Sequence, residues 1–167
     1  MSAPRSALSY DPMEPMPPQE ADWTCSACSL AWMNRALGIM AATDELAAVE
    51  RIGCPENINP EWGLMDASGA RLVQCLREEG APAFSCWPTF DDAVRMAREW
   101  PMLIGGVGWY HWVGVRVSGD FNLILANSAR GWMGIFDNLL ADDWERLGPF
   151  AAVPVPLLRN FPPIPTS

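Results

Sequence analysis

The pattern of apolar and polar positions divides the chain into a helical first half and a strand-rich second half. Apolar groups recur at helical spacing, between cap and stop residues, over four stretches: 26–37, 43–52, 66–79 and 89–100. From Pro101 onward the period changes to short runs rich in β-branched and aromatic residues, which are typical of antiparallel strands: PMLIGGV, WYHWVGVRV, FNLILANS and FAAVPVPL. A short helix is expected over 140–148. Helices followed by a meandering sheet predict an α+β fold.

Local signals set the expected ends of these elements. Thr43 is the expected N-cap of the second helix, and Thr89 with Asp92 resembles a capping box at the start of the fourth. In the third helix, an apolar stripe is expected to be buried: Leu72, Val73 and Leu76. The segment 54–65 contains two prolines and is expected to be a loop.

The two ends of the chain differ in composition from the rest. Residues 1–22 hold five prolines among small and acidic groups, and the chain ends in NFPPIPTS. We therefore expect an extended arm over 1–18, a single domain over 19–157 and a proline-rich tail over 158–167.

Charge and hydropathy exclude several classes of partner. The 167 residues are 50% hydrophobic and carry a net charge of −9, from 20 acidic and 11 basic residues. All the basic residues are arginine and none of them cluster, so neither nucleic acid nor an anionic membrane surface is an expected partner. Neither a secretory signal nor an apolar stretch long enough to span a membrane is found, which favours a cytoplasmic or virion-associated protein.

The five cysteines do not form a disulfide framework, because their number is odd and their spacing is irregular. We expect a reducing compartment with at least one functional thiol. Cys54, Cys75 and Cys86 lack the spacing of metal ligands, so neither a metal nor another cofactor is expected.

Three residues together indicate thiol chemistry. Cys25 lies at the start of a predicted helix, where unpaired amides favour a thiolate. His111, the only histidine, lies on a predicted strand and could take the thiol proton. Asn127 ends the next strand and could orient the imidazole. Gln19, six residues before Cys25, could donate to an oxyanion together with the backbone N–H of Cys25.

The motifs Gln19, CSACSLAWM, YHWVGV and LILANS resemble those of papain-like cysteine peptidases, most closely the compact bacterial branch of bacteriocin-processing double-glycine peptidases. The resemblance covers residues 19–145 by element order. It implies a papain-like fold with Cys25 as nucleophile, His111 as base, Asn127 as orienting residue and Gln19 as oxyanion donor.

The chain departs from this family pattern at Ser26, at Asn127-Ser128, where the compact branch usually has Asp-Pro, and in having a second cysteine, Cys28. Ser26 stands where the family usually has glycine, so it is expected to adjoin the substrate. Cys28 is a second possible nucleophile, although Gln19 is then nine residues away instead of six. The pair Cys25-x-x-Cys28 also has the spacing of a redox motif, but the usual buried strand does not precede it.

Three of the nine tryptophans have positions that favour substrate contact. Trp109 is expected on the same strand face as His111, where it either walls a cleft or packs in the core. Trp62 and Trp132 lie in predicted loops next to glycine, as expected of exposed contact residues.

The leading hypothesis is a thiol hydrolase that cleaves peptide or amide bonds, with peptidoglycan stem peptides as one possible substrate. The alternative is a catalytically silent papain-like structural or assembly protein, such as a virion or tail component, whose proline-rich arms bind partner chains.

Overall fold

The structure is a computed structural model, and it describes residues 8–11, 13–106, 111–117, 123–128, 138–139, 141–147 and 150–157. The helices are α1 (Cys25–Ala36), α2 (Glu45–Ile52), α3 (Ala70–Glu78), α4 (Phe90–Glu99) and α5 (Ala141–Leu147). The strands are β1 (Ile58–Asn59), β2 (Gly63–Leu64), β3 (Met102–Gly106), β4 (His111–Val117), β5 (Leu123–Ala126), β6 (Asn138–Leu139) and β7 (Phe150–Pro154). The predicted α+β order, helices first and sheet second, is confirmed.

Five of the strands form one antiparallel sheet in the order β6-β5-β4-β3-β7. The other two, β1 and β2, pair as a short hairpin inside the segment 54–65, so the expectation of an irregular loop there was wrong. The hairpin forms because the Asn59 side-chain oxygen accepts from the backbone N–H groups of Glu61 and Trp62, at 3.0 and 2.9 Å. This side-chain turn brings Ile58 opposite Leu64.

Helix starts follow the sequence signals with two corrections. The Thr89 hydroxyl accepts from the Asp92 N–H at 3.2 Å, so the predicted cap of α4 is confirmed. The cap of α2 is Asp44 and not Thr43, because the Asp44 carboxylate accepts from Ala47 N–H at 2.8 Å. The third helix begins after Gly69 instead of at residue 66.

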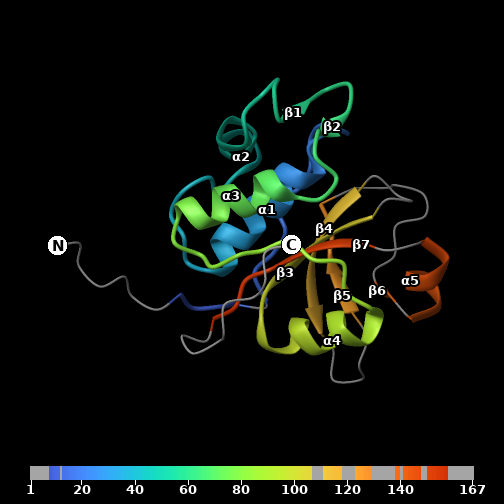
Figure 1. Ribbon diagram of the computed structural model, residues 1–167. Coiled ribbons are helices and arrows are strands. Elements are labelled where there is room, and N and C mark those ends of the chain that lie inside the picture. The colour runs from blue at the N-terminus through green and yellow to red at the C-terminus, as the bar shows by residue number, and fades with distance from the viewer. Residues whose placement is uncertain are drawn as a thin grey trace.

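Both faces of the large sheet are buried. The side chains of β3 and β4 alternate between two clusters: Leu103 and Trp112 pack with α1, α2 and α3, whereas Ile104 and Val113 pack with α4 and Trp144 of α5. Figure 1 shows this division, with α1, α2 and α3 grouped together and α4 at the opposite end of the molecule. The predicted stripe of α3 lies in the first cluster.

Helix α1 is almost completely buried and lies on β4 across glycine. All of its residues except Arg35 are buried. The Trp32 ring lies where a side chain at position 114 would be, since a Cβ on Gly114 would come within 2.5 Å of it. The ring of Trp112 covers Gly105 and Gly69 in the same way, at 2.3 and 2.6 Å from their added Cβ atoms. The absence of side chains at these glycines therefore leaves room for the rings of Trp32 and Trp112 in the core.

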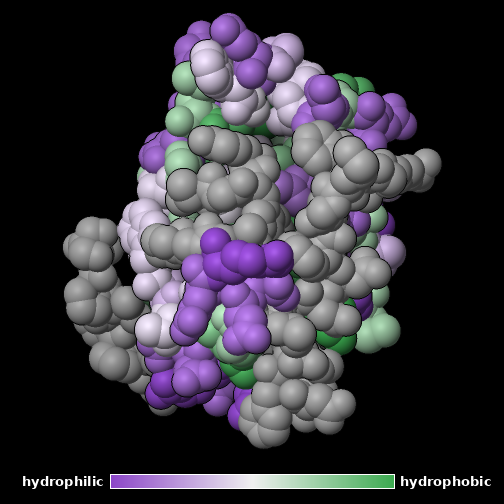
Figure 2. Space-filling view, turned by 90° about the vertical axis from the view of Figure 1, so that its right-hand side faces the viewer, coloured by the Kyte–Doolittle hydropathy of each residue, from purple (hydrophilic) through white to green (hydrophobic). Residues whose placement is uncertain are grey.

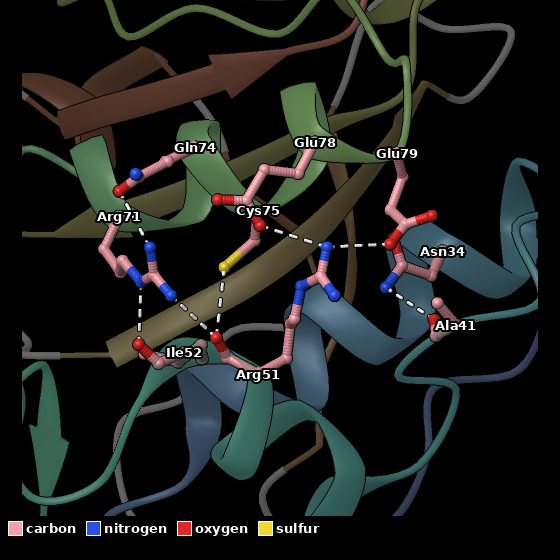
Figure 3. Close-up of polar contacts among 9 residues, drawn as sticks. All are labelled: Asn34, Ala41, Arg51, Ile52, Arg71, Gln74, Cys75, Glu78 and Glu79. Carbon is pink, nitrogen blue, oxygen red and sulfur yellow. Dashed lines mark hydrogen bonds and ion pairs between the residues drawn. The ribbon is translucent and has the colours of Figure 1, made fainter.

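The C-terminal end of α2 is bound to α3 by arginine (Figure 3). Arg71 donates to the carbonyl oxygens of Ile52 and Arg51, at 2.7 and 2.8 Å. Arg51 in turn pairs with Glu78 and Glu79, at 3.0 and 2.8 Å. A cation at the C-terminus of α2 complements the helix dipole and satisfies carbonyls that α2 itself leaves unpaired.

Residues 8–11 and 13–18, the described part of the expected arm, form neither helix nor strand and contact α1. Asp11 N–H donates to Ala36 O at 2.8 Å, and Glu14 pairs with Arg35 at 2.9 Å. The Glu14 carbonyl accepts from the indole N–H of Trp32, also at 2.8 Å. These contacts bring the arm over α1.

Helix α5 is amphipathic. Trp144 is buried against the rings of Phe90 and Phe150, whose centroids lie 6.0 and 4.7 Å away. Asp142 and Glu145 are exposed. Figure 2, which faces the side where α5 lies in Figure 1, shows hydrophilic residues gathered near the middle of that surface.

The variant Gly114→Ala should lower the free energy of unfolding by about 1–3 kcal/mol, as overpacking a core does. The reason is the 2.5 Å approach between the added Cβ and the Trp32 ring. Urea unfolding followed by circular dichroism measures the loss. In a Trp32→Leu background the same substitution should cost much less, and an equal cost in both backgrounds would contradict this packing.

Candidate active site

Cys25 lies at the N-terminus of α1 with its sulfur directed at backbone N–H groups. The side chain is 8% exposed, and its sulfur accepts from the backbone N–H of Trp112 at 3.4 Å. Burial raises the pKa of the Cys25 thiol, while the N–H groups of Trp112, Ser26 and Cys25 itself act to lower it. The preceding residue, Thr24, does not cap the helix with its side chain.

His111 and Asn127 are brought together by the pairing of β4 with β5. Gly114 pairs with Ala126, so the residue after β5 falls near the start of β4. His111 Nε2 lies 2.8 Å from Asn127 Oδ1. Because an amide oxygen only accepts, Nε2 carries the proton, and Nδ1 is left as the basic nitrogen. Burial lowers the pKa of His111, and the bond to Asn127 partly opposes this shift.

Cys25 and His111 line one cleft of about 270 Å³. Its walls come from the segment before α1, the β1–β2 hairpin and the facing ends of β3 and β4: Asp22, Trp23, Pro60, Glu61, Trp62, Gly63, Leu64, Ala67, Gly105, Gly106 and Trp112. Trp62, expected to be an exposed contact residue, lines this cleft and is 70% exposed. The carboxylates of Asp22 and Glu61 are the charged groups among the described lining residues.

Gln19 is fixed next to Ser128, one residue after Asn127. Its side-chain oxygen accepts from the Ser128 hydroxyl at 2.9 Å, and its backbone N–H donates to Ser128 O at 3.0 Å. Its amide nitrogen donates to Ala21 O at 2.6 Å, which leaves one amide proton. Gln19 does not belong to the described residues that line the cleft, so its oxyanion role stays a prediction.

Cys28 faces away from the cleft. Its side chain is fully buried, at 0% exposure, and burial together with the charge of Glu45 raises the pKa of its thiol to about 12. Of the two cysteines in α1, only Cys25 lies among the described lining residues.

Three other predicted contact residues do not join the described site. Ser26 is fully buried and is not among the described residues that line the cleft, so its contact with substrate stays a prediction. The helical turn directs its side chain about 100° away from that of Cys25, into the packed side of α1. Trp109 and Trp132 lie outside the described residues.

Sequence reasoning missed several residues that shape the site. Asp22, Trp23 and Glu61 line the cleft, and Ser128 and Glu45 hold the segment before Cys25. The acidic residues and Trp23 adjoin predicted site residues along the chain. Ser128 directly follows Asn127, but Ser128 and Glu45 are distant in sequence from the groups they bind, so no local pattern marks these contacts.

Within the described ranges, no three His, Cys, Asp or Glu side chains gather as a metal site would require. In the same ranges, no helix has the length and apolar character needed to cross a membrane.

Comparison with solved structures identifies the architecture. A double-glycine motif protease from an AMS/PCAT transporter, solved in complex with the leader peptide, superposes with a TM-score of 0.60. The match covers 84% of this chain and 91% of that chain at 14% sequence identity. This chain has the papain-like fold. In this fold Cys25 begins α1 and His111 begins β4, and both line the same cleft. No protein-family model and no curated protein sequence matches the chain.

The rate of alkylation of Cys25 by iodoacetamide in the unliganded protein should rise about tenfold for each pH unit. This rise should continue above pH 8.5, which is about the pKa of an ordinary cysteine. The sign follows from burial, which raises the pKa of the thiol, so the reactive thiolate is scarce at neutral pH. Mass spectrometry of the Cys25 peptide separates this rate from that of exposed Cys54. A constant rate between about pH 5 and pH 8 would contradict the expectation, because it would reveal a preformed thiolate–imidazolium pair.

Proposed function

We propose that this chain is a thiol hydrolase that cleaves peptide or amide bonds through an acyl-enzyme on Cys25. The proposal rests on one observation: Cys25 and His111 line the same cleft of a papain-like fold. In addition, His111 Nε2 lies 2.8 Å from Asn127 Oδ1.

Acylation begins with transfer of the Cys25 thiol proton to His111 Nδ1 as the sulfur attacks the scissile carbonyl carbon. Asn127 keeps the other proton on Nε2 and so holds the imidazole in the basic tautomer throughout. The carbonyl oxygen becomes an oxyanion, for which the backbone N–H of Cys25 and the free amide proton of Gln19 are the proposed donors. His111 then returns its proton to the leaving amine, the carbon–nitrogen bond breaks, and a thioester remains.

Deacylation repeats these steps with water. His111 Nδ1 takes a proton from a water molecule as the water oxygen attacks the thioester carbon. Collapse of the second tetrahedral intermediate breaks the carbon–sulfur bond, restores the Cys25 thiol and releases a carboxylic acid.

The substrate is proposed to be a peptide chain. The protease with the matching fold was solved in complex with a leader peptide, which supports a peptide here as well. The carboxylates of Asp22 and Glu61 at the cleft, together with the net charge of −9, favour a neutral or cationic segment over the anionic stem peptides of peptidoglycan.

The alternative of a silent assembly protein rested on the proline-rich arms. Asp11 and Glu14 of the arm are bound by the chain's own α1, so the described part of the arm does not call for a partner chain. Measurement of turnover separates the two hypotheses.

The substitution Cys25→Ala should abolish both hydrolysis of a fluorogenic peptide library and labelling by an epoxide probe. Cys28→Ala is the matched control, because its thiol is buried in the same helix and does not line the cleft. It should retain at least about half of both signals. Loss of activity in Cys28→Ala with retention in Cys25→Ala would overturn the assignment, and no turnover by the wild-type chain would favour the silent scaffold.

The substitution Glu61→Gln should reduce the preference for cationic peptides. For a pair of substrates that differ only in arginine against citrulline, we expect the wild-type kcat/KM ratio to fall about three- to tenfold in the variant and at high salt. Glu56→Gln, an exposed change in the same segment but outside the cleft, should leave the ratio unchanged. An unaltered ratio in Glu61→Gln would exclude this carboxylate from substrate selection.

A further inference from the structure

The carboxylate of Glu45, at the start of α2, binds the segment that leads from Gln19 to Cys25. Its two oxygens accept from the backbone N–H of Glu20, both at 3.2 Å, and one also accepts from the N–H of Ala21 at 3.3 Å. The same oxygen accepts a short hydrogen bond from the hydroxyl of Thr24. A single half-buried side chain thus contacts three residues of the segment before the nucleophile.

Thr24 occupies the N-cap position of α1 without acting as a cap. Threonine is a favoured N-cap, because its hydroxyl oxygen can accept from the second or third N–H of the helix. Here the backbone has φ −105° and ψ 17°, and no side-chain capping bond forms. The hydroxyl lies instead beside Glu45 and the Ala21 carbonyl oxygen, which is 2.9 Å away.

One of the two N–H groups that a cap would occupy interacts with Cys25 instead. The second N–H of α1 belongs to Ser26, and it acts on the Cys25 sulfur. A capping Thr24 would compete for this donor. Thr24, a residue type that often caps helices, thus precedes the nucleophile, but its hydroxyl donates to Glu45 of α2 and does not accept from α1.

The position of Glu45 is itself fixed from the far end of α2. Arg71 binds the carbonyl oxygens of Arg51 and Ile52, and Arg51 pairs with Glu78 and Glu79 (Figure 3). The helix is short, so anchoring its C-terminus to α3 also restrains its N-terminal residue.

We infer that Glu45 is a positioning residue that keeps Thr24 from capping α1 and thereby leaves the N–H of Ser26 to the Cys25 sulfur. The inference rests on the proposed function, since it names a residue that prepares the same site. Glu45 does not touch the reacting atoms and acts through Thr24.

The test is a double-mutant cycle between Glu45→Gln and Thr24→Val, with Glu50→Gln as the control. Glu50 is an exposed carboxylate on the same helix. The readouts are the iodoacetamide labelling rate of the Cys25 peptide at fixed pH, kcat and KM per folded molecule, and the thermal unfolding midpoint.

Glu45→Gln should lower the labelling rate and kcat by about tenfold with little change in KM, as expected when a catalytic group is misplaced without loss of substrate contacts. Glu50→Gln should stay within about twofold of wild type. Valine cannot cap a helix, so in the Thr24→Val background Glu45→Gln should cause at most about a threefold loss.

Two results would overturn the inference: an unchanged Cys25 labelling rate in Glu45→Gln, or an equal loss in both backgrounds. The second result would mean that Glu45 only stabilises the fold. A lower unfolding midpoint of Glu45→Gln with an unchanged labelling rate and kcat would mean the same. Failure of the proposed function is distinguishable, because labelling does not require turnover. A chain without hydrolysis that still shows the labelling pattern keeps the role of Glu45 and loses the hydrolase assignment.

Discussion

The contact of Trp32 with Gly114 fixes α1 on β4, and the candidate site depends on that contact. A helix can approach a strand this closely only where the strand lacks a side chain, and Gly114 provides the space for the indole ring. Since Cys25 begins α1 and His111 begins β4, seating the helix on the strand brings both residues to one end of the sheet. Trp112 adds a second contact of the same kind over Gly105, and both residues line the cleft. Packing in the core thus determines where Cys25 and His111 lie relative to one another.

The electrostatic state of the site follows from its burial. Loss of water raises the pKa of Cys25 and lowers the pKa of His111, so both groups favour their neutral forms before substrate binds. Backbone N–H groups oppose the shift at Cys25, and they are the groups suited to receive negative charge once it develops. In the proposed hydrolysis the proton therefore moves during attack on the substrate carbonyl, and the contact with Asn127 would determine which imidazole nitrogen receives it.

The predictable features were those encoded locally. Thr89 with Asp92 marked the start of α4, and the order of Cys25, His111 and Asn127 along predicted elements indicated the candidate site, because helix ends and strand ends are read from short windows. Strands of two residues, β1 and β2, are too short to show a period. Thr43 and Asp44 are adjacent residues that can both cap a helix, so the sequence did not show that Asp44 is the one that caps α2. Glu45 and Ser128 act on segments distant in sequence, so only the folded chain reveals them.

The central claim is that Cys25 becomes acylated by substrate. A peptidyl nitrophenyl ester mixed with the protein and quenched in acid allows intact mass measurement within the first turnover. The account predicts a burst of nitrophenol equal to the concentration of sites and a mass increase by one acyl group, located on the Cys25 peptide. Acylation of Cys28, or release of nitrophenol without any acylated protein, would contradict it.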